Sequence, residues 1–261
     1  MILPVLVANW KMNKTPSETE AILSEIIPPL QELKTGAEIE VVIATPYTSL
    51  PLAARMLAGT GIALGAQDCH WGEEGPFTGE ISARMLAEIG CRFVILGHSE
   101  RRELFGETNR RINMKAATAL LFDLTPIICV GEKEDERASG HTEMVVEEQL
   151  NRCLEGLKLD PGQRVFVAYE PVWAIGSGRT PTPSEVDQIH RLIRAELLAT
   201  FGEQTGCRLP ILYGGSVTTA NVGPMMALDA LDGCLVGGAS LAASSFLPIA
   251  GLVRASGPQG A

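Results

Sequence analysis

Short apolar segments recur along the whole chain, separated by longer segments in which apolar residues are spaced as in helices. The short segments are rich in Val, Ile and Leu and have the length of buried β-strands. They occupy residues 5–7, 40–45, 62–66, 93–96, 126–130, 165–169, 209–213 and 233–236. We therefore expect eight strands.

Most of the intervening segments carry apolar residues three and four positions apart, which is the period of an amphipathic helix. The clearest examples are residues 17–33, 82–89, 110–121, 144–154 and 184–199. Strands that alternate with helices pair in parallel through right-handed crossovers. Eight such units predict an α/β fold closed into a (β/α)8 barrel, with a doubly wound open sheet as the alternative.

Composition favours one domain and argues against nucleic acid as a partner. A chain of 261 residues, 46% of them hydrophobic, suits a single barrel. We expect residues 1–253 to form it and the Gly- and Ser-containing tail, 254–261, to fray. The net charge of -10 repels nucleic acid phosphates, so an anionic ligand would need a local Lys or a ring of backbone N–H groups.

The six cysteines and four histidines show no metal-ligand spacing. We expect reduced thiols, no bound metal and a cytoplasmic protein, since the apolar start lacks the basic region of a signal peptide. Residues 234–253 are uncharged and nominally long enough to span a membrane. Their Gly, Ser and Pro content instead predicts a buried strand, a glycine turn and a helix, so we expect no membrane association.

Polar residues follow several predicted strands, and the carboxyl ends of barrel strands meet at one mouth. Asn9 and Lys11 follow the first strand, His98 the fourth and Glu170 the sixth. Pro171 favours an extended Glu170, which then projects from its strand as a candidate base. His98 opens a helical turn whose N–H groups disfavour an imidazolium, so a neutral hydrogen-bond donor is expected. The alternatives are a solvated lysine, a core histidine and a surface glutamate.

Glycines follow the last two strands, at residues 214–215 and 237–238. Backbone N–H groups in such turns can approach a phosphate, and a short helix beginning at Ser240 would add its positive end. Ordinary tight bends are the alternative. The segment 67–79 has no period and contains three glycines, Trp71 and Phe77, which is typical of a binding loop.

Five segments, in order and across nearly the whole chain, resemble the triosephosphate isomerase family. They are residues 9–13 (NWKMN), 97–102 (GHSERR), 168–178 (AYEPVWAIGSG), 213–217 (YGGSV) and 236–238 (VGG). The resemblance implies a TIM barrel that interconverts dihydroxyacetone phosphate and D-glyceraldehyde 3-phosphate through an enediolate, in glycolysis and gluconeogenesis. It implies no cofactor and no metal.

The resemblance also assigns roles to residues at matching positions. Glu170 would be the base and His98 the neutral electrophile, while Lys11 and Asn9 would stabilise the enediolate oxygen and the bound anion, with Glu100 beside them. The phosphate would be held by backbone N–H groups of Gly176, Ser216, Gly237 and Gly238.

A lid is implied at residues 174–178, which would close over the substrate and exclude water. Tyr213 and Ser216 resemble the family's latch for the closed lid. We also expect Ile175 and Leu235 to close around Glu170 as a hydrophobic clamp that desolvates its carboxylate. For each of them, an ordinary core residue is the alternative.

The loop at residues 75–80 resembles the segment through which this family forms homodimers, with Thr78 inserted toward the partner's Asn13 and the partner's Lys11. A loop packed only on itself is the alternative. Ser177 stands where the family commonly has Thr, and residues 179–181 (RTP) replace a Lys-Thr-Ala-like hinge, so a typical rate of lid opening is not expected.

Two other functions compete with isomerisation. Another phosphosugar barrel enzyme, an aldolase or an epimerase, would need a Schiff-base Lys within a strand or a metal cluster, and neither is visible in the sequence. A phosphate-binding barrel without turnover would not require Lys11, His98 and Glu170 together.

Overall fold

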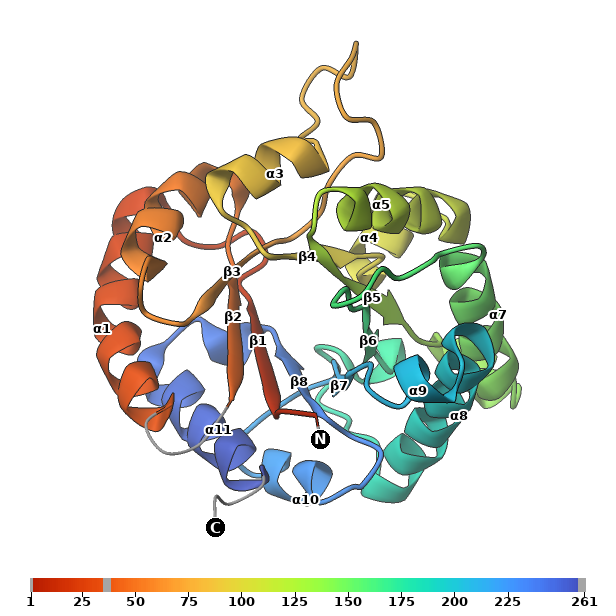
Figure 1. Cartoon of the computed structure of the whole chain (residues 1–261). Helices are drawn as coiled ribbons and strands as arrows, with labels where there is room; N and C mark the ends of the chain where they lie inside the picture. The colour runs from red at the N-terminus through yellow and green to blue at the C-terminus, as the bar shows by residue number, and fades with distance from the viewer. Residues whose placement is uncertain (1, 35–38, 258–261) are drawn as a thin grey trace.

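Eight parallel strands close into a barrel in the computed structural model, which describes residues 2–34 and 39–257. Neighbouring strands pair in chain order and β8 pairs with β1, as Figure 1 shows in a view along the barrel. The strands are β1 Val5–Asn9, β2 Glu40–Ala44, β3 Ala63–Ala66, β4 Phe93–Leu96, β5 Thr125–Val130, β6 Phe166–Tyr169, β7 Ile211–Tyr213 and β8 Gly233–Val236. The predicted (β/α)8 barrel is confirmed, and the open sheet is wrong because β1 and β8 are not edges.

Helices surround the strands as an outer ring (Figure 1). They are α1 Pro16–Lys34, α2 Leu50–Leu57, α3 Ala83–Ile89, α4 Ser99–Leu104, α5 Asn109–Leu121, α6 Glu134–Ala138, α7 Thr142–Leu154, α8 Pro183–Phe201, α9 Glu203–Gly206, α10 Val222–Met226 and α11 Ala243–Ala255. The start of α8 illustrates the local signals. Thr182 accepts a hydrogen bond from the Glu185 N–H, and the Glu185 carboxylate accepts one from the Thr182 N–H. Pro183 lies in the first turn, where a backbone N–H would have no partner within the helix, so its lack of an N–H costs nothing.

Alternation along each strand divides the apolar residues into two cores. One set fills the barrel interior and includes Val5, Val7, Phe166 and Ala168. The other set packs between the strands and the helices. Because successive side chains of a strand point to opposite faces, the next interior positions after Val7 and Ala168 belong to Asn9 and Glu170. The pleat therefore directs these two polar side chains into the mouth of the barrel.

The segment between β3 and α3 extends beyond the ring of helices, as the orange and yellow loop in Figure 1 shows. It has no helix or strand, as expected from its sequence, and an aromatic group organises it. His70 stacks on Trp71, and its ring centre also lies 4.1 Å from that of Phe77. Phe77 remains 41% exposed, so the loop presents an apolar side chain to solvent.

The chain after β8 differs from the prediction in detail. A short 3-10 turn spans Gly238–Ser240, so Ser240 ends a turn where we expected it to begin a helix, and α11 starts only at Ala243. That helix continues to Ala255, two residues past the predicted end of the barrel, and residues 258–261 of the predicted tail lie outside the described residues. No helix in residues 2–34 or 39–257 is long and apolar enough to cross a membrane.

His190 on α8 gives the fold a pH-dependent contribution to stability. The side chain is fully buried, its Nδ1 lies 3.3 Å from the Ala230 carbonyl oxygen, and Nε2 has no hydrogen-bond partner among the described residues. Burial lowers the pKa of His190 from 6.5 to about 4, against an opposing effect of the Ala230 carbonyl. The unfolded state therefore binds this proton more tightly than the folded state does.

We predict that this contribution, about 3 kcal/mol in total, is fully present above pH 6.5 and is lost as the pH falls toward 4. Urea unfolding at a series of pH values should show a shallower acid dependence of the free energy of unfolding for His190→Gln than for wild type. His141→Gln, at an exposed histidine, is the control and should follow wild type. Equal slopes for all three proteins would refute the assignment.

Candidate active site

A cavity of about 360 Å³ opens at the carboxyl ends of the strands. It brings together residues that are far apart in the sequence but were each singled out from it. They are Asn9, Lys11, His98, Glu170, Ile175, Gly176, Ser216, Leu235, Gly237 and Gly238. The main candidate groups therefore surround one space rather than several.

Glu170 lies directly after β6 and is only 1% exposed. Its backbone N–H donates to the Val130 carbonyl at 2.7 Å, which extends the pairing of β5 and β6 by one residue. The carboxylate Oε2 accepts a hydrogen bond of 2.8 Å from the Ser99 N–H at the start of α4. Oε1 lies 3.0 Å from His98 Nε2, but without hydrogen-bond alignment, and it has no hydrogen-bond partner within the described part of the chain. One carboxylate oxygen is thus held and the other is left available.

His98 reaches the cavity because the chain turns at Gly97. This glycine has φ +70°, and a Cβ added to it would lie 2.5 Å from Ile112 Cδ1, so the turn requires glycine. The His98 Nδ1 accepts a hydrogen bond of 3.2 Å from the Glu100 N–H. Because Nδ1 then carries no proton, a neutral His98 carries its proton on Nε2, the atom beside Glu170.

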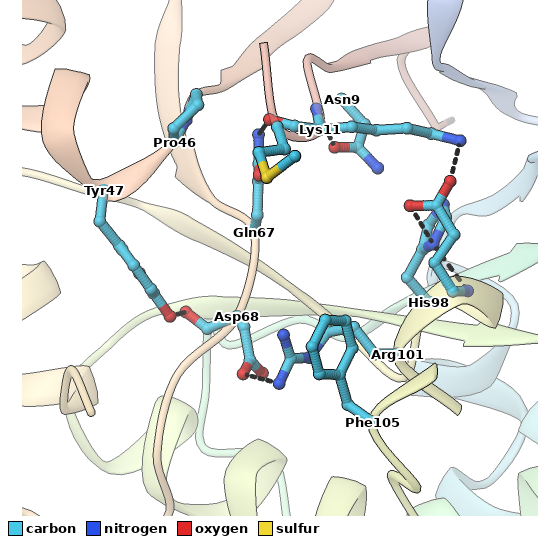
Figure 2. Close-up of a pocket in the computed structure, with 11 residues that line it drawn as sticks. Asn9, Lys11, Pro46, Tyr47, Gln67, Asp68, His98, Arg101 and Phe105 are labelled. Atoms are coloured by element: carbon cyan, nitrogen blue, oxygen red, sulfur yellow. Dashed lines mark hydrogen bonds and ion pairs between the residues drawn. The ribbon is translucent and has the colours of Figure 1, made fainter. Parts of the chain in front are cut away.

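Lys11 is held in an uncommon backbone conformation, with φ 53°. The Asn9 Oδ1 accepts from the Lys11 N–H at 3.0 Å, and Gln67 Nε2 donates to the Lys11 and Ala44 carbonyls at 3.0 Å each. The Lys11 Nζ lies 2.6 Å from a Glu100 oxygen, so Glu100 stands beside an ammonium group that lines the cavity. Figure 2 shows Lys11 extending across the site toward the side of His98, with Gln67 against its backbone.

Gln67 was missed as a site residue by the sequence analysis, which placed it only at the start of a loop. A signal for it exists, because Gln67 directly follows β3 (Ala63–Ala66). The rule that polar residues after barrel strands face the mouth applies to it as well as to Asn9 and Glu170.

The ends of β7 and β8 form a glycine-lined wall close to Glu170 and Lys11. A Cβ on Gly214 would lie 2.9 Å from Glu170 Cγ, and one on Gly237 would lie 3.2 Å from Lys11 Cε. Larger residues here would press on the candidate base and the ammonium group. The wall therefore brings main chain without side chains close to a lysine, on a chain of net charge -10.

A 3-10 turn, Val172–Ala174, leads into the expected lid at residues 174–178, and residues 176–180 are exposed. Trp173 anchors its start, since its Nε1 donates to Glu132 at 2.7 Å; burial raises the pKa of this Glu132 carboxyl. The unusual lid residue Ser177 contacts the unusual hinge residue Arg179, because the Arg179 N–H donates to Ser177 Oγ at 3.2 Å. Arg179 also pairs with Glu134 on α6 at 2.6 Å.

Two predicted residues lie away from the cavity. Tyr213 ends β7, and its hydroxyl is buried with no partner among the described residues, so it is free to accept or donate if the lid moves. Thr78 is exposed on the loop that leaves the ring of helices and does not line the cavity of its own chain. No group of three His, Cys, Asp or Glu side chains in the described ranges is arranged to hold a metal ion.

Comparison with known proteins agrees with this arrangement. The model of the family described as triosephosphate isomerase matches residues 4–253. The chain belongs to the triosephosphate isomerase family.

Individual members of this family resemble the chain over nearly its full length. The triosephosphate isomerase of Herpetosiphon aurantiacus is 48% identical over 246 residues, which cover 94% of this chain and 97% of that protein. That of Thermoanaerobacter pseudethanolicus is 43% identical over 246 residues, with 94% and 98% covered. The crystal structure of triosephosphate isomerase from Bartonella henselae superposes with a TM-score of 0.86 at 36% identity, covering 97% of this chain and 100% of that one.

In this member of the triosephosphate isomerase family, the expected hydrophobic clamp around Glu170 can be tested. Ile175 and Leu235 line the same cavity as Glu170, and Leu235 is only 3% exposed. Replacing either with Ala should lower kcat about tenfold, equivalent to about 1.4 kcal/mol in the barrier, because water would reach the carboxylate. Steady-state kinetics at a temperature where each variant is folded by circular dichroism would measure this. Unchanged turnover in both variants would rule out the clamp.

Proposed function

We propose that the protein interconverts dihydroxyacetone phosphate and D-glyceraldehyde 3-phosphate. The observation that carries the proposal is the single cavity that holds a buried carboxylate, an imidazole beside it, an ammonium group and a glycine-lined wall. Moving a proton between adjacent carbons next to a carbonyl needs these parts: a base, a donor for the developing oxyanion and a fixed grip on the substrate.

Glu170 takes the proton from the carbon next to the carbonyl, and the electron pair of that C–H bond forms the enediolate. His98 donates from Nε2 to the oxygen on which charge develops and takes a proton back from the neighbouring hydroxyl. Glu170 then returns its proton to the other carbon. The reaction is an isomerisation, so it consumes no oxidant, reductant or second substrate.

The remaining groups bind charge. Lys11 and Asn9 stabilise the enediolate oxygen and the anionic substrate, with Glu100 orienting the ammonium group. The backbone N–H groups of Gly176, Ser216, Gly237 and Gly238 hold the phosphate. When the lid closes, Ile175 and Leu235 shield the Glu170 carboxylate from water, and Tyr213 helps to latch the lid.

The alternative phosphosugar chemistries find less support. Lys115 is buried, but it lies on α5, where its ammonium group pairs with Asp68 and Glu107. It therefore does not line the cavity as an aldolase Schiff-base lysine would. A binding barrel without turnover would have no use for a buried Glu170 Oε1 that lies beside His98 and has no hydrogen-bond partner in residues 2–34 and 39–257.

Changing the base tests the function directly. Glu170→Gln keeps the size of the side chain and removes its proton-accepting carboxylate, so kcat should fall by about 10²–10⁴. A coupled isomerase assay in both directions, with a chelator and no added metal, would measure it. Glu88→Gln, at an exposed site on α3, is the control and should retain wild-type activity. An inactive wild-type protein would refute the function, and an equally active Glu170→Gln would refute the assigned base.

We also propose a homodimer in which the loop carrying Thr78 enters the neighbouring subunit near the partner's Asn13 and the partner's Lys11. A second hollow, of about 260 Å³, adjoins the active site on the side of Lys11 (Figure 2). Met12 and Phe105 line it and are 96% and 65% exposed, which is an apolar surface of the kind that subunits cover. The exposed Phe77 of the loop offers a matching apolar group.

Light scattering should give a mass of twice the 27.9 kDa of one chain at micromolar concentration. Thr78→Arg should shift the protein toward monomer and lower its activity, because a charged side chain would be forced into the interface. Leu121→Arg, on the outer end of α5, should remain dimeric. A monomeric wild type would contradict this assembly.

The cytoplasm is the compartment we propose. All six cysteines lie in the described part of the chain, five of them are buried, and none forms a disulfide. Reduced thiols are typical of that compartment.

A further inference from the structure

The pairing between β5 and β6 continues past the ends of both strands and includes the base. Val130 O accepts from the Glu170 N–H at 2.7 Å, and Glu132 O accepts from the Val172 N–H at 3.1 Å. The residue between these two acceptors is Gly131. The main chain around Gly131 therefore supports both Glu170 and the first residue of the lid's 3-10 turn.

Gly131 also touches the backbone of Glu170 more closely than any side chain would allow. A Cβ added to Gly131 would lie 1.7 Å from the Glu170 carbonyl oxygen and 2.6 Å from its carbonyl carbon. At this separation a displacement of Gly131 toward β6 pushes on Glu170 itself. The position of the base thus depends on what holds Gly131 in place.

Gly131 directs its own polar groups away from β6, because successive residues of a strand turn their backbone groups to opposite neighbours. The neighbour on that side, β4, ends at Leu96, which pairs with Ile128. Side chains take over where β4 stops. Arg102 Nη2 donates to the Cys129 carbonyl at 2.9 Å. Gly131, the next residue that faces this side, is bound by Gln149.

The Gln149 amide binds both backbone groups of Gly131. Its Oε1 accepts from the Gly131 N–H at 2.8 Å, and its Nε2 donates to the Gly131 carbonyl at 3.1 Å. Gln149 belongs to α7 in the outer ring and does not line the active-site cavity. One side-chain amide therefore takes the place that a longer β4 would occupy, and it links α7 to the backbone beside the base.

We propose that Gln149 is a positioning residue for Glu170 and the start of the lid, acting through Gly131. The inference rests on the proposed isomerase function, in which Glu170 moves the proton. It predicts a specific kinetic effect, because three of the four positions proposed to hold the phosphate, Ser216, Gly237 and Gly238, follow other strands. Loss of the Gln149 amide should slow the chemical step and leave substrate binding nearly intact.

The first experiment compares Gln149→Met, which keeps the length of the side chain and loses both hydrogen bonds, with wild type. Glu148→Gln, at the exposed neighbouring position of α7, is the matched control. We expect kcat to fall about tenfold or more in Gln149→Met and KM to change less than about threefold, since a small displacement of a catalytic group has a large effect on rate. A kcat equal to that of the control, or a loss confined to KM, would overturn the proposal.

Gln149→Glu separates positioning from a general packing role. A protonated carboxyl can donate to the Gly131 carbonyl as the amide does, whereas an ionised one cannot. The kcat of this variant relative to wild type should therefore rise as the pH is lowered, while the ratio for Gln149→Met stays flat. A flat ratio for Gln149→Glu would show that donation to Gly131 is unimportant and would overturn the mechanism.

Amide hydrogen exchange by NMR tests the same inference without activity. The N–H groups of Glu170 and Val172 should exchange at least about tenfold faster in Gln149→Met than in Glu148→Gln, because their acceptors flank Gly131. The N–H of Val7 in β1 should exchange equally in both. Unchanged exchange at Glu170 and Val172 would overturn the proposal, whereas an inactive wild type would refute the isomerase function and leave this readout intact.

Discussion

The hydrogen-bonded closure between β1 and β8 is the constraint on which the rest of the molecule depends. In a closed barrel every strand has a fixed interior face, so the two-residue alternation that buries Val7 and Ala168 also sets the direction of the next side chains on that face. Asn9 and Glu170 face the mouth for the same reason that their predecessors face the core. Stability and chemistry thus share one register, and a one-residue slip in β6 would turn the candidate base toward the helices.

The site has to bind an anionic substrate on a chain whose overall charge is negative. A buried carboxylate, a lysine and a glycine-lined wall meet at the mouth of a protein with a net charge of -10. The surrounding negative surface repels anions in general, so the local arrangement has to attract the phosphate on its own. This makes geometry, rather than overall charge, the source of selectivity for an anionic substrate.

Much of the fold was predictable because its signals are local. Strand and helix periods, the Thr182 cap and the polar residues after the strands each lie within a few neighbouring positions. Gln67 carried that last signal, since it directly follows β3, and was overlooked. Gln149 could not be read in this way, because it acts by hydrogen bonds to the backbone of a distant segment. Gly131 gave no distinct signal either, since its need for glycine comes from Glu170, 39 positions away. The turn at Ser240 was mispredicted because the start of a 3-10 turn resembles that of a helix.

The left-handed backbone of Lys11 has an evolutionary consequence. A side chain in that conformation costs about 1–2 kcal/mol, and glycine would remove the cost together with the ammonium group. Under the role in turnover that we propose for Lys11, adaptation to heat and adaptation to speed pull in opposite directions at this residue. A lineage that lost its need for the reaction would then be free to relax the strain here.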